Sequence, residues 1–170
     1  GDRKRYEKYA PQPELSGSFE ITYIPRDADP ETIRNAGADA DILFADAISR
    51  VDGNVIRQMK NLKLIHSEGV AYNGIDADAA RELGIYVCNN RGANDGAVAE
   101  QAVYLMLALL RSGIAGDRAV REGRQIEMKE RLMTEGITDL ADCRVGLVGM
   151  GDIGQATARC LQAFGCELCY

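Results

Sequence analysis

The stretch "VGLVGMGDIGQATARCLQAFGCELCY", residues 145–170, joins an apolar run, a glycine-rich turn and a helical pattern in direct succession. Its glycines fit the pattern G-x-G-x-x-G. In such a turn the first glycine permits a tight strand-to-helix connection, the second lets the backbone approach a pyrophosphate, and the third lets the helix pack closely. Negative charge then rests on N–H groups at the positive end of the helix. We predict a dinucleotide-binding turn made of Gly149, Met150, Gly151, Asp152, Ile153 and Gly154.

The alternative interpretation is a structural glycine turn that binds no ligand. If the turn does bind a dinucleotide, its identity depends on an acidic side chain about 20 positions after the motif, which contacts the ribose of NAD. Residues 167–170 have the pattern of the second strand, which is still running at Tyr170. The sequence therefore leaves both NAD and NADP open as the cofactor.

Upstream of this turn, short β-rich runs alternate with helical stretches. Such alternation predicts βαβ units and a mostly parallel sheet with helices on both faces. Ligands bind such sheets beyond the carboxyl ends of the strands, which here are the loops after Asp46, Ser67 and Asn89. The expected strands are 19–24, 41–46, 62–67 and 85–89, and the expected helices are 30–37, 51–61 and 76–84.

The composition limits the classes of partner and location. The 170 residues are 46% hydrophobic and 27% charged, with a formal net charge of −6, which is ordinary for a globular protein with a core. An acidic chain repels phosphate backbones, so we expect no nucleic-acid partner. The longest apolar run, 102–110, is too short to cross a bilayer, so we expect no membrane partner. Five cysteines, an odd number, favour reduced thiols and a cytoplasmic location.

We do not expect a metal site. The C-x-x-C pair, Cys166 and Cys169, lies on an expected strand, where residues three apart face opposite sides. Further ligands are scarce, because the chain has one histidine, His66. We therefore expect these two cysteines to serve as small core residues.

Two longer stretches resemble one protein family. Residues 62–103, "LKLIHSEGVAYNGIDADAARELGIYVCNNRGANDGAVAEQAV", and residues 139–165, "DLADCRVGLVGMGDIGQATARCLQAFG", resemble the D-isomer-specific 2-hydroxyacid dehydrogenases. The resemblance implies an α/β chain with a flavodoxin-like substrate domain and a Rossmann domain, a doubly wound parallel sheet that binds the dinucleotide. We assign residues 1–93 to the substrate domain, with its first strand missing, and residues 94–170 to an NAD(P)-binding domain that is incomplete at its C-terminus.

The resemblance also implies a reaction and a set of binding residues. The reaction is hydride transfer between NAD(P)(H) and a D-2-hydroxy acid or 2-oxo acid such as glyoxylate, hydroxypyruvate or phosphoglycerate. Backbone N–H groups of Glu68, Gly69 and Val70 are expected to hold the substrate carboxylate, with the glycine giving close approach. Asn94 is expected to bind substrate, and Val98 the cofactor, at the nicotinamide end.

The sequence departs from the family pattern in the substrate loop. Ala71 stands where the family has its second glycine, and Asn73-Gly74 replaces an Asp-Asn pair. Asn-Gly suits a tight turn, so we expect the fold to be kept and the loop shape to differ.

Residues 97–111, "AVAEQAVYLMLALLR", form a helical pattern that is apolar almost all round. Such a helix is buried on most sides, so we expect it between domains or at a subunit interface. The charge-rich stretch 116–136 follows and predicts an exposed helical arm. The helix and the arm together suggest a two-fold homodimer, as in the relatives.

The catalytic residues are not expected in this chain. In the relatives an arginine, an acidic residue and a histidine lie downstream of the second Rossmann strand. We therefore expect the 170 residues alone to be inactive and poorly stable, and His66 to pack or hydrogen-bond rather than act as acid or base. Two alternatives remain open: a dehydrogenase-like, NAD-sensing corepressor or scaffold without turnover, and a cofactor-free remnant.

Overall fold

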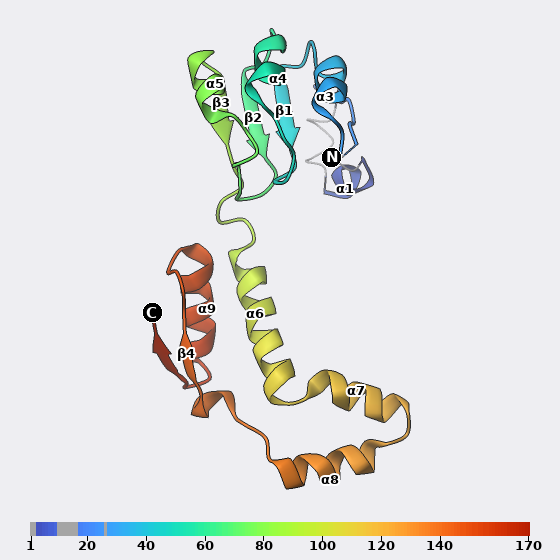
Figure 1. The fold of residues 1–170 in the computed structure, drawn as a ribbon, viewed down its shortest axis with the longest axis vertical. Coiled ribbons are helices and arrows are strands. Elements are labelled where there is room, and N and C mark those ends of the chain that lie inside the picture. The colour runs from blue at the N-terminus through green and yellow to red at the C-terminus, as the bar shows by residue number, and fades with distance from the viewer. Residues whose placement is uncertain (1–2, 10–16, 26) are drawn as a thin grey trace. The chain divides into compact units, whose positions relative to one another are not determined.

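The computed structural model describes residues 3–9, 17–25 and 27–170 (Figure 1). The chain divides into two compact units, residues 1–91 and 92–170. Each unit has a hydrophobic core of its own. The division lies close to the boundary predicted from the sequence.

The first unit is built on a parallel sheet. Its strands, among the described residues, pair in the order β1 (Ile42–Ala45), β2 (Leu64–Ser67) and β3 (Tyr86–Cys88). The register places Phe44 beside His66, and His66 beside Cys88. Leu43 and Ile65 point to the other face, where they are buried, because successive side chains of a strand alternate between faces. The α/β class with parallel strands is confirmed.

Three short helices accompany these strands, as the alternation predicted. They are α3 (Pro30–Ala36), α4 (Gly53–Gln58) and α5 (Ala77–Glu82). Each begins at an aspartate whose side chain accepts N–H bonds from the first turn, which satisfies amides that have no helical acceptor. These N-caps are Asp29, Asp52 and Asp76. Buried residues of the three helices join Leu43 and Ile65 in one core, so the helices pack on that side of the sheet. The alternation predicted helices on both faces, whereas Phe44, on the opposite face, is 56% exposed.

The strand predicted at residues 19–24 is absent, and this prediction is wrong. The segment has no regular structure. Helix α1 (Arg3–Tyr9) precedes it in the chain. Phe19 is 55% exposed and Ile21 is 39% exposed, while Ile24 packs partly against the core. A strand needs a neighbour that exchanges backbone hydrogen bonds with it, and β1 pairs only with β2 among the described strands. A β-rich composition alone does not supply that neighbour.

The second unit contains the predicted strand-turn-helix-strand unit. Strand β4 (Arg144–Gly146) pairs in parallel with β5 (Glu167–Cys169), and α9 (Asp152–Gln162) connects them. Helix α6 (Asp95–Leu110) packs against α9, and the short helix η1 (Leu140–Asp142) leads into β4. The core of this unit is formed by the fully buried Leu161 together with Val103 and Leu140.

Helix α6 is less buried than its sequence predicted. Within the described residues, only Ala99 and Val103 of this helix are buried. Tyr104, Leu105 and Leu109 are exposed, Leu109 to 81%. Within this single chain α9 and η1 cover only one side of the helix. The expected interface on its other sides stays a prediction.

The charged arm is formed by α7 (Gly113–Arg121) and α8 (Gln125–Glu135), which follow α6. Ser112, between α6 and α7, has a φ of 49°. Within the part of the chain that the structure describes, no single helix is long and apolar enough to span a membrane. The pair α6 and α7, bent by 65°, passes that test on length and composition alone.

Candidate functional site

The glycine-rich turn between β4 and α9 has a backbone conformation that requires glycine at two positions. Gly149 has a φ of +103°, a conformation that residues with a Cβ rarely adopt. A Cβ added to Gly154 would lie 2.2 Å from the Gly149 carbonyl oxygen. The fold of the turn therefore requires glycine at both positions.

Gly151 has a different reason to be glycine. Its φ is −71°, which any residue can adopt, and an added Cβ would meet no described atom within 4 Å. The turn itself thus has room for a side chain at this position. The open space beside the Gly151 backbone is where a ligand can approach the amides of the turn closely.

The first turn of α9 presents hydrogen-bond donors without acceptors. Gly151 is the N-cap residue and offers no side chain to accept them. The amides of Gly151, Ile153 and Gly154 have no hydrogen-bond acceptor among the described residues, while the Gln155 amide donates to Gly151 O at 2.9 Å. Gln155 Nε2 donates to Met150 O at 3.0 Å, so this carbonyl is already engaged within the turn. Outward N–H groups at a helix N-terminus, with room at Gly151, fit the diphosphate of a dinucleotide.

The loop after β2 carries the predicted carboxylate-binding residues and is held by its carbonyl groups. Asn89 Nδ2 donates to Val70 O at 2.8 Å, and the Asn90 amide donates to Gly69 O at 3.0 Å. Ser67, which is fully buried, donates from Oγ to Ala71 O at 2.6 Å. Three successive carbonyls of the loop are thereby fixed against the ends of β2 and β3.

Two backbone amides in this loop are available to a ligand. Gly69 N–H and Val70 N–H donate to no acceptor within the described residues, whereas the Glu68 amide donates to Ala45 O at 2.8 Å. Two adjacent N–H groups suit a carboxylate, which accepts hydrogen bonds only. The glycine at position 69 also has a structural cause, since an added Cβ would lie 2.7 Å from the Cβ of Ala47.

The departures from the family pattern are accommodated in the same loop. Ala71 supplies the carbonyl that Ser67 holds. A Cβ on Gly74 would lie 2.2 Å from Ser49 O, so the Asn73-Gly74 turn packs directly on the segment after β1. Gly74 O accepts from the Val51 amide at 2.8 Å, which ties the two segments together.

The remaining predicted residues lie on strand β2 and on helix α6 with its N-cap. His66, on β2, contacts Cys88 through Nδ1 at 3.0 Å and Phe44 through its ring. Asn94 is the N-cap residue of α6 and makes no side-chain cap bond there, and Val98 follows one turn later, 36% exposed. Gly69 and Val70 thus belong to the first unit, and Asn94, Val98 and the glycine turn belong to the second.

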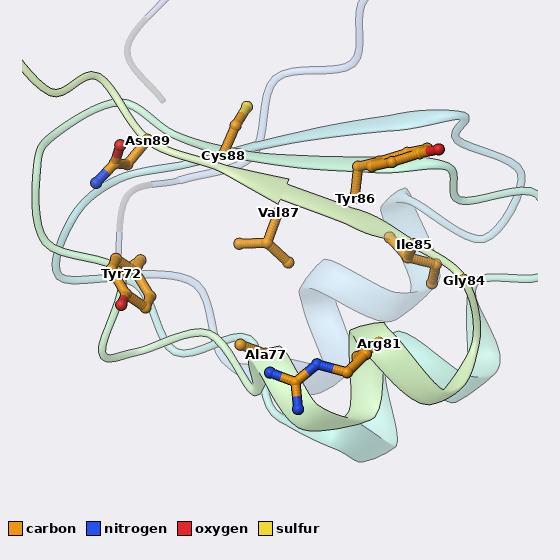
Figure 2. A pocket seen from close by; sticks show the side chains of 9 residues that line it. All are labelled: Tyr72, Ala77, Arg81, Gly84, Ile85, Tyr86, Val87, Cys88 and Asn89. Carbon is orange, nitrogen blue, oxygen red and sulfur yellow. The ribbon is translucent and has the colours of Figure 1, made fainter.

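Sequence reasoning missed the residues that hold the carboxylate loop, Ser67 and Asn89. Their one sequence signal is a polar residue at the carboxyl end of an apolar strand, which many strands share. It also missed a hollow of about 590 Å³ between α5 and β3, with Tyr72, Arg81 and Val87 among its walls. Figure 2 shows Val87 pointing from β3 toward α5 inside this hollow. Such a hollow depends on how a helix meets a strand, which local patterns do not predict.

Comparisons with known proteins place these features in a family. A family model described as D-isomer specific 2-hydroxyacid dehydrogenase, catalytic domain, matches residues 5–167. The chain is 35% identical over 130 residues to the hydroxypyruvate reductase of Thermotoga maritima, across 76% of this chain and 41% of that protein. It is 35% identical over 138 residues to the glyoxylate reductase of Thermococcus onnurineus, across 78% of this chain and 40% of that protein.

A solved structure agrees with these matches. A Polaromonas protein described as a D-isomer specific 2-hydroxyacid dehydrogenase, NAD-binding, superposes with a TM-score of 0.75 at 32% identity, over 91% of this chain and 49% of that chain. The chain spans less than half the length of the relatives named here.

Proposed function

The chain belongs to the D-isomer specific 2-hydroxyacid dehydrogenase family, and on this premise we propose that it serves hydride transfer between a nicotinamide dinucleotide and a small D-2-hydroxy acid or 2-oxo acid. The observation that carries the proposal is the uncapped N-terminus of α9. There the amides of Gly151, Ile153 and Gly154 lack acceptors within the described residues, and Gly151 leaves room for a ligand. The dinucleotide, when bound, supplies or accepts the hydride.

In this proposal the residues of this chain bind and orient the dinucleotide and the substrate. The turn of residues 149–154 holds the diphosphate, and the amides of Gly69 and Val70 hold the substrate carboxylate. Ser67 and Asn89 keep the carbonyls of that loop turned inward, so that the amides stay available. Relatives named for glyoxylate and hydroxypyruvate reduction support a short 2-oxo acid as the substrate. The proposal includes NAD and NADP equally.

The binding part of the proposal is tested on the chain itself. We expect NADH or NADPH, titrated into ¹⁵N-labelled chain, to shift the amide resonances of Gly151, Ile153 and Gly154. Oxalate, a small dicarboxylate that mimics a 2-oxo acid, should shift those of Gly69 and Val70. Resonance shifts spread evenly over the surface, or none at the turn, would contradict the proposal.

Turnover is tested on the natural protein in its whole length. Oxidation of NADH or NADPH is followed with glyoxylate, hydroxypyruvate and other 2-oxo acids. Reduction of at least one of them is expected. Dinucleotide binding without any turnover would instead favour a sensing or scaffold role.

We extend the proposal to a homodimer located in the cytoplasm. Support for the homodimer comes from the exposed apolar side of α6, with Tyr104, Leu105 and Leu109. Such a surface is removed from water when a second copy covers it. The five free cysteines support a reducing compartment. Sedimentation of the natural protein measures its oligomeric state. Alkylation of its thiols in cell extracts measures whether they are reduced.

A further inference from the structure

A row of three side chains crosses one face of the sheet in the first unit. Phe44, His66 and Cys88 lie side by side in the register of β1, β2 and β3. Figure 2 shows Cys88 projecting from the side of β3 opposite to Val87, which points toward α5. Phe44 is 56% exposed on this face, and Cys88 is exposed as well. The Cys88 thiol therefore lies open to small solutes.

His66 and Cys88 are in direct polar contact. His66 Nδ1 lies 3.0 Å from Cys88 Sγ, and the imidazole ring meets Phe44 edge-on, with centroids 5.2 Å apart. The aromatic contact orients the imidazole, and the pairing of two adjacent strands sets its distance from the thiol. An imidazole nitrogen in this position can take the thiol proton, which leaves the nucleophilic thiolate.

The other cysteines have different surroundings. Cys143, Cys166 and Cys169 each donate to a backbone carbonyl oxygen, at 3.4, 3.4 and 3.7 Å. Cys160 packs against the core of the second unit. A carbonyl oxygen accepts the S–H hydrogen bond but cannot act as a base toward the thiol. Among the five cysteines, all of which the structure describes, only Cys88 is both exposed and beside a base.

We propose that Cys88 is a nucleophilic thiol, with His66 as its proton acceptor, that forms mixed disulfides with low-molecular-weight disulfides. The Sγ proton moves to His66 Nδ1, and the thiolate attacks one sulfur of the disulfide. A bond forms between that sulfur and Cys88 Sγ, and the original S–S bond breaks. The other half leaves as a thiolate and takes up a proton from the imidazolium or from water. The exchange needs no further oxidant, and excess free thiol reverses it.

The reaction is tested by following single cysteines of the chain during incubation with glutathione disulfide at pH 7. Trypsin cleaves after Arg81 and Arg91, so Cys88 is released alone in residues 82–91, and Cys143 is released alone in residues 132–144. Mass spectrometry of quenched samples then gives one rate for each. A synthetic peptide of residues 82–91 is the unfolded reference, because it keeps the neighbours of Cys88 and lacks His66.

We expect Cys88 to react about tenfold faster in the chain than in the peptide, because a free thiol is only a few per cent thiolate at neutral pH. Cys143 should react more slowly than Cys88. Folding without activation can only slow a thiol, so a rate in the chain no higher than in the peptide overturns the proposal. This comparison uses the unchanged chain and does not depend on the folding of any variant.

His66→Asn separates proton acceptance from packing. Asparagine keeps a side-chain hydrogen-bond acceptor near the thiol but takes no proton at neutral pH. The rate at Cys88 should fall about tenfold, to that of the peptide. Amide resonances of the first unit, to which His66 and Cys88 both belong, report whether the variant keeps its fold. An unchanged rate at Cys88 in the folded variant would also overturn the proposal.

Discussion

Replacing Gly151 by alanine should weaken dinucleotide binding and leave the fold intact. Alanine adopts the φ of −71° without strain, and its Cβ would meet nothing within 4 Å. Lower entropy of the unfolded chain stabilises the variant by about 0.4–1 kcal/mol, and poorer N-capping destabilises it by about 0.5–1 kcal/mol. The two effects oppose each other, so the free energy of unfolding should stay close to that of the wild type.

The affinity for the dinucleotide, in contrast, should fall. The new methyl group enters the space through which a diphosphate reaches the amides of Gly151, Ile153 and Gly154. Loss of one hydrogen bond to a charged group costs about 1.5–3 kcal/mol, which raises Kd by about 10- to 150-fold.

Gly154→Ala is the matched comparison at the same turn. Its Cβ would lie 2.2 Å from Gly149 O, far inside the 3.4–4 Å of ordinary contact, so the backbone has to move. Overpacking of this kind costs about 1–3 kcal/mol of stability. This variant should lose stability and binding together, whereas Gly151→Ala loses binding alone.

The assays are calorimetric titration with NADH and NADPH and urea unfolding of the same samples. Gly116→Ala in α7 is the control, since it also has open space around an added Cβ and no positive φ. The reasoning is refuted if Gly151→Ala binds as tightly as the Gly116→Ala control. A wild-type chain that binds neither dinucleotide would refute the proposed function itself.

Three other perturbations test separate parts of the structure. Ser67→Ala removes the donor to Ala71 O and should lower the free energy of unfolding in urea by about 1 kcal/mol; no change would mean that this bond does not hold the loop. The Thr32 amide that donates to Asp29 lowers the pKa of that carboxyl below its ordinary value, so the stabilising cap is present above the unfolded-state pKa and is lost as pH falls through the folded-state pKa. Asp29→Asn keeps an acceptor without this titration, so its acid unfolding curve should lack that component; identical curves would count against the assignment. Leu109→Asp places a charge on the exposed side of α6 and should convert a dimer of the natural protein to monomers in sedimentation; a persisting dimer would exclude this surface.

Much of the fold follows from local signals. Strands β1, β2 and β3 and helices α3, α4 and α5 lie within the ranges that the alternation of β-rich runs and helical stretches predicted. The strand-turn-helix-strand unit around Gly149 was predicted from the apolar run and the glycine spacing, and the turn itself requires glycine at positions 149 and 154. These signals act over a few residues, so a sequence displays them directly.

The failures concern interactions between distant segments. The β-rich segment 19–24 has a strand composition but joins neither of the two sheets of the described residues. Helix α6 has the apolar surface of a buried helix, yet the sequence does not say how many neighbours cover it. The contact of His66 with Cys88 comes from strand register, and the need for glycine at position 69 comes from the approach of Ala47. None of these can be read from neighbours in the sequence.

Helix α8 buries none of its 11 residues, all of which the structure describes. A helix of fewer than about 12–15 residues is only marginally stable in water without tertiary packing. Its amides should therefore exchange with deuterium almost as fast as those of an unfolded peptide, whereas α9, anchored by the fully buried Leu161, stays protected. The ion pair between Arg131 and Glu135, at 3.7 Å, is exposed and screened by salt, so exchange in α8 should quicken further as ionic strength rises.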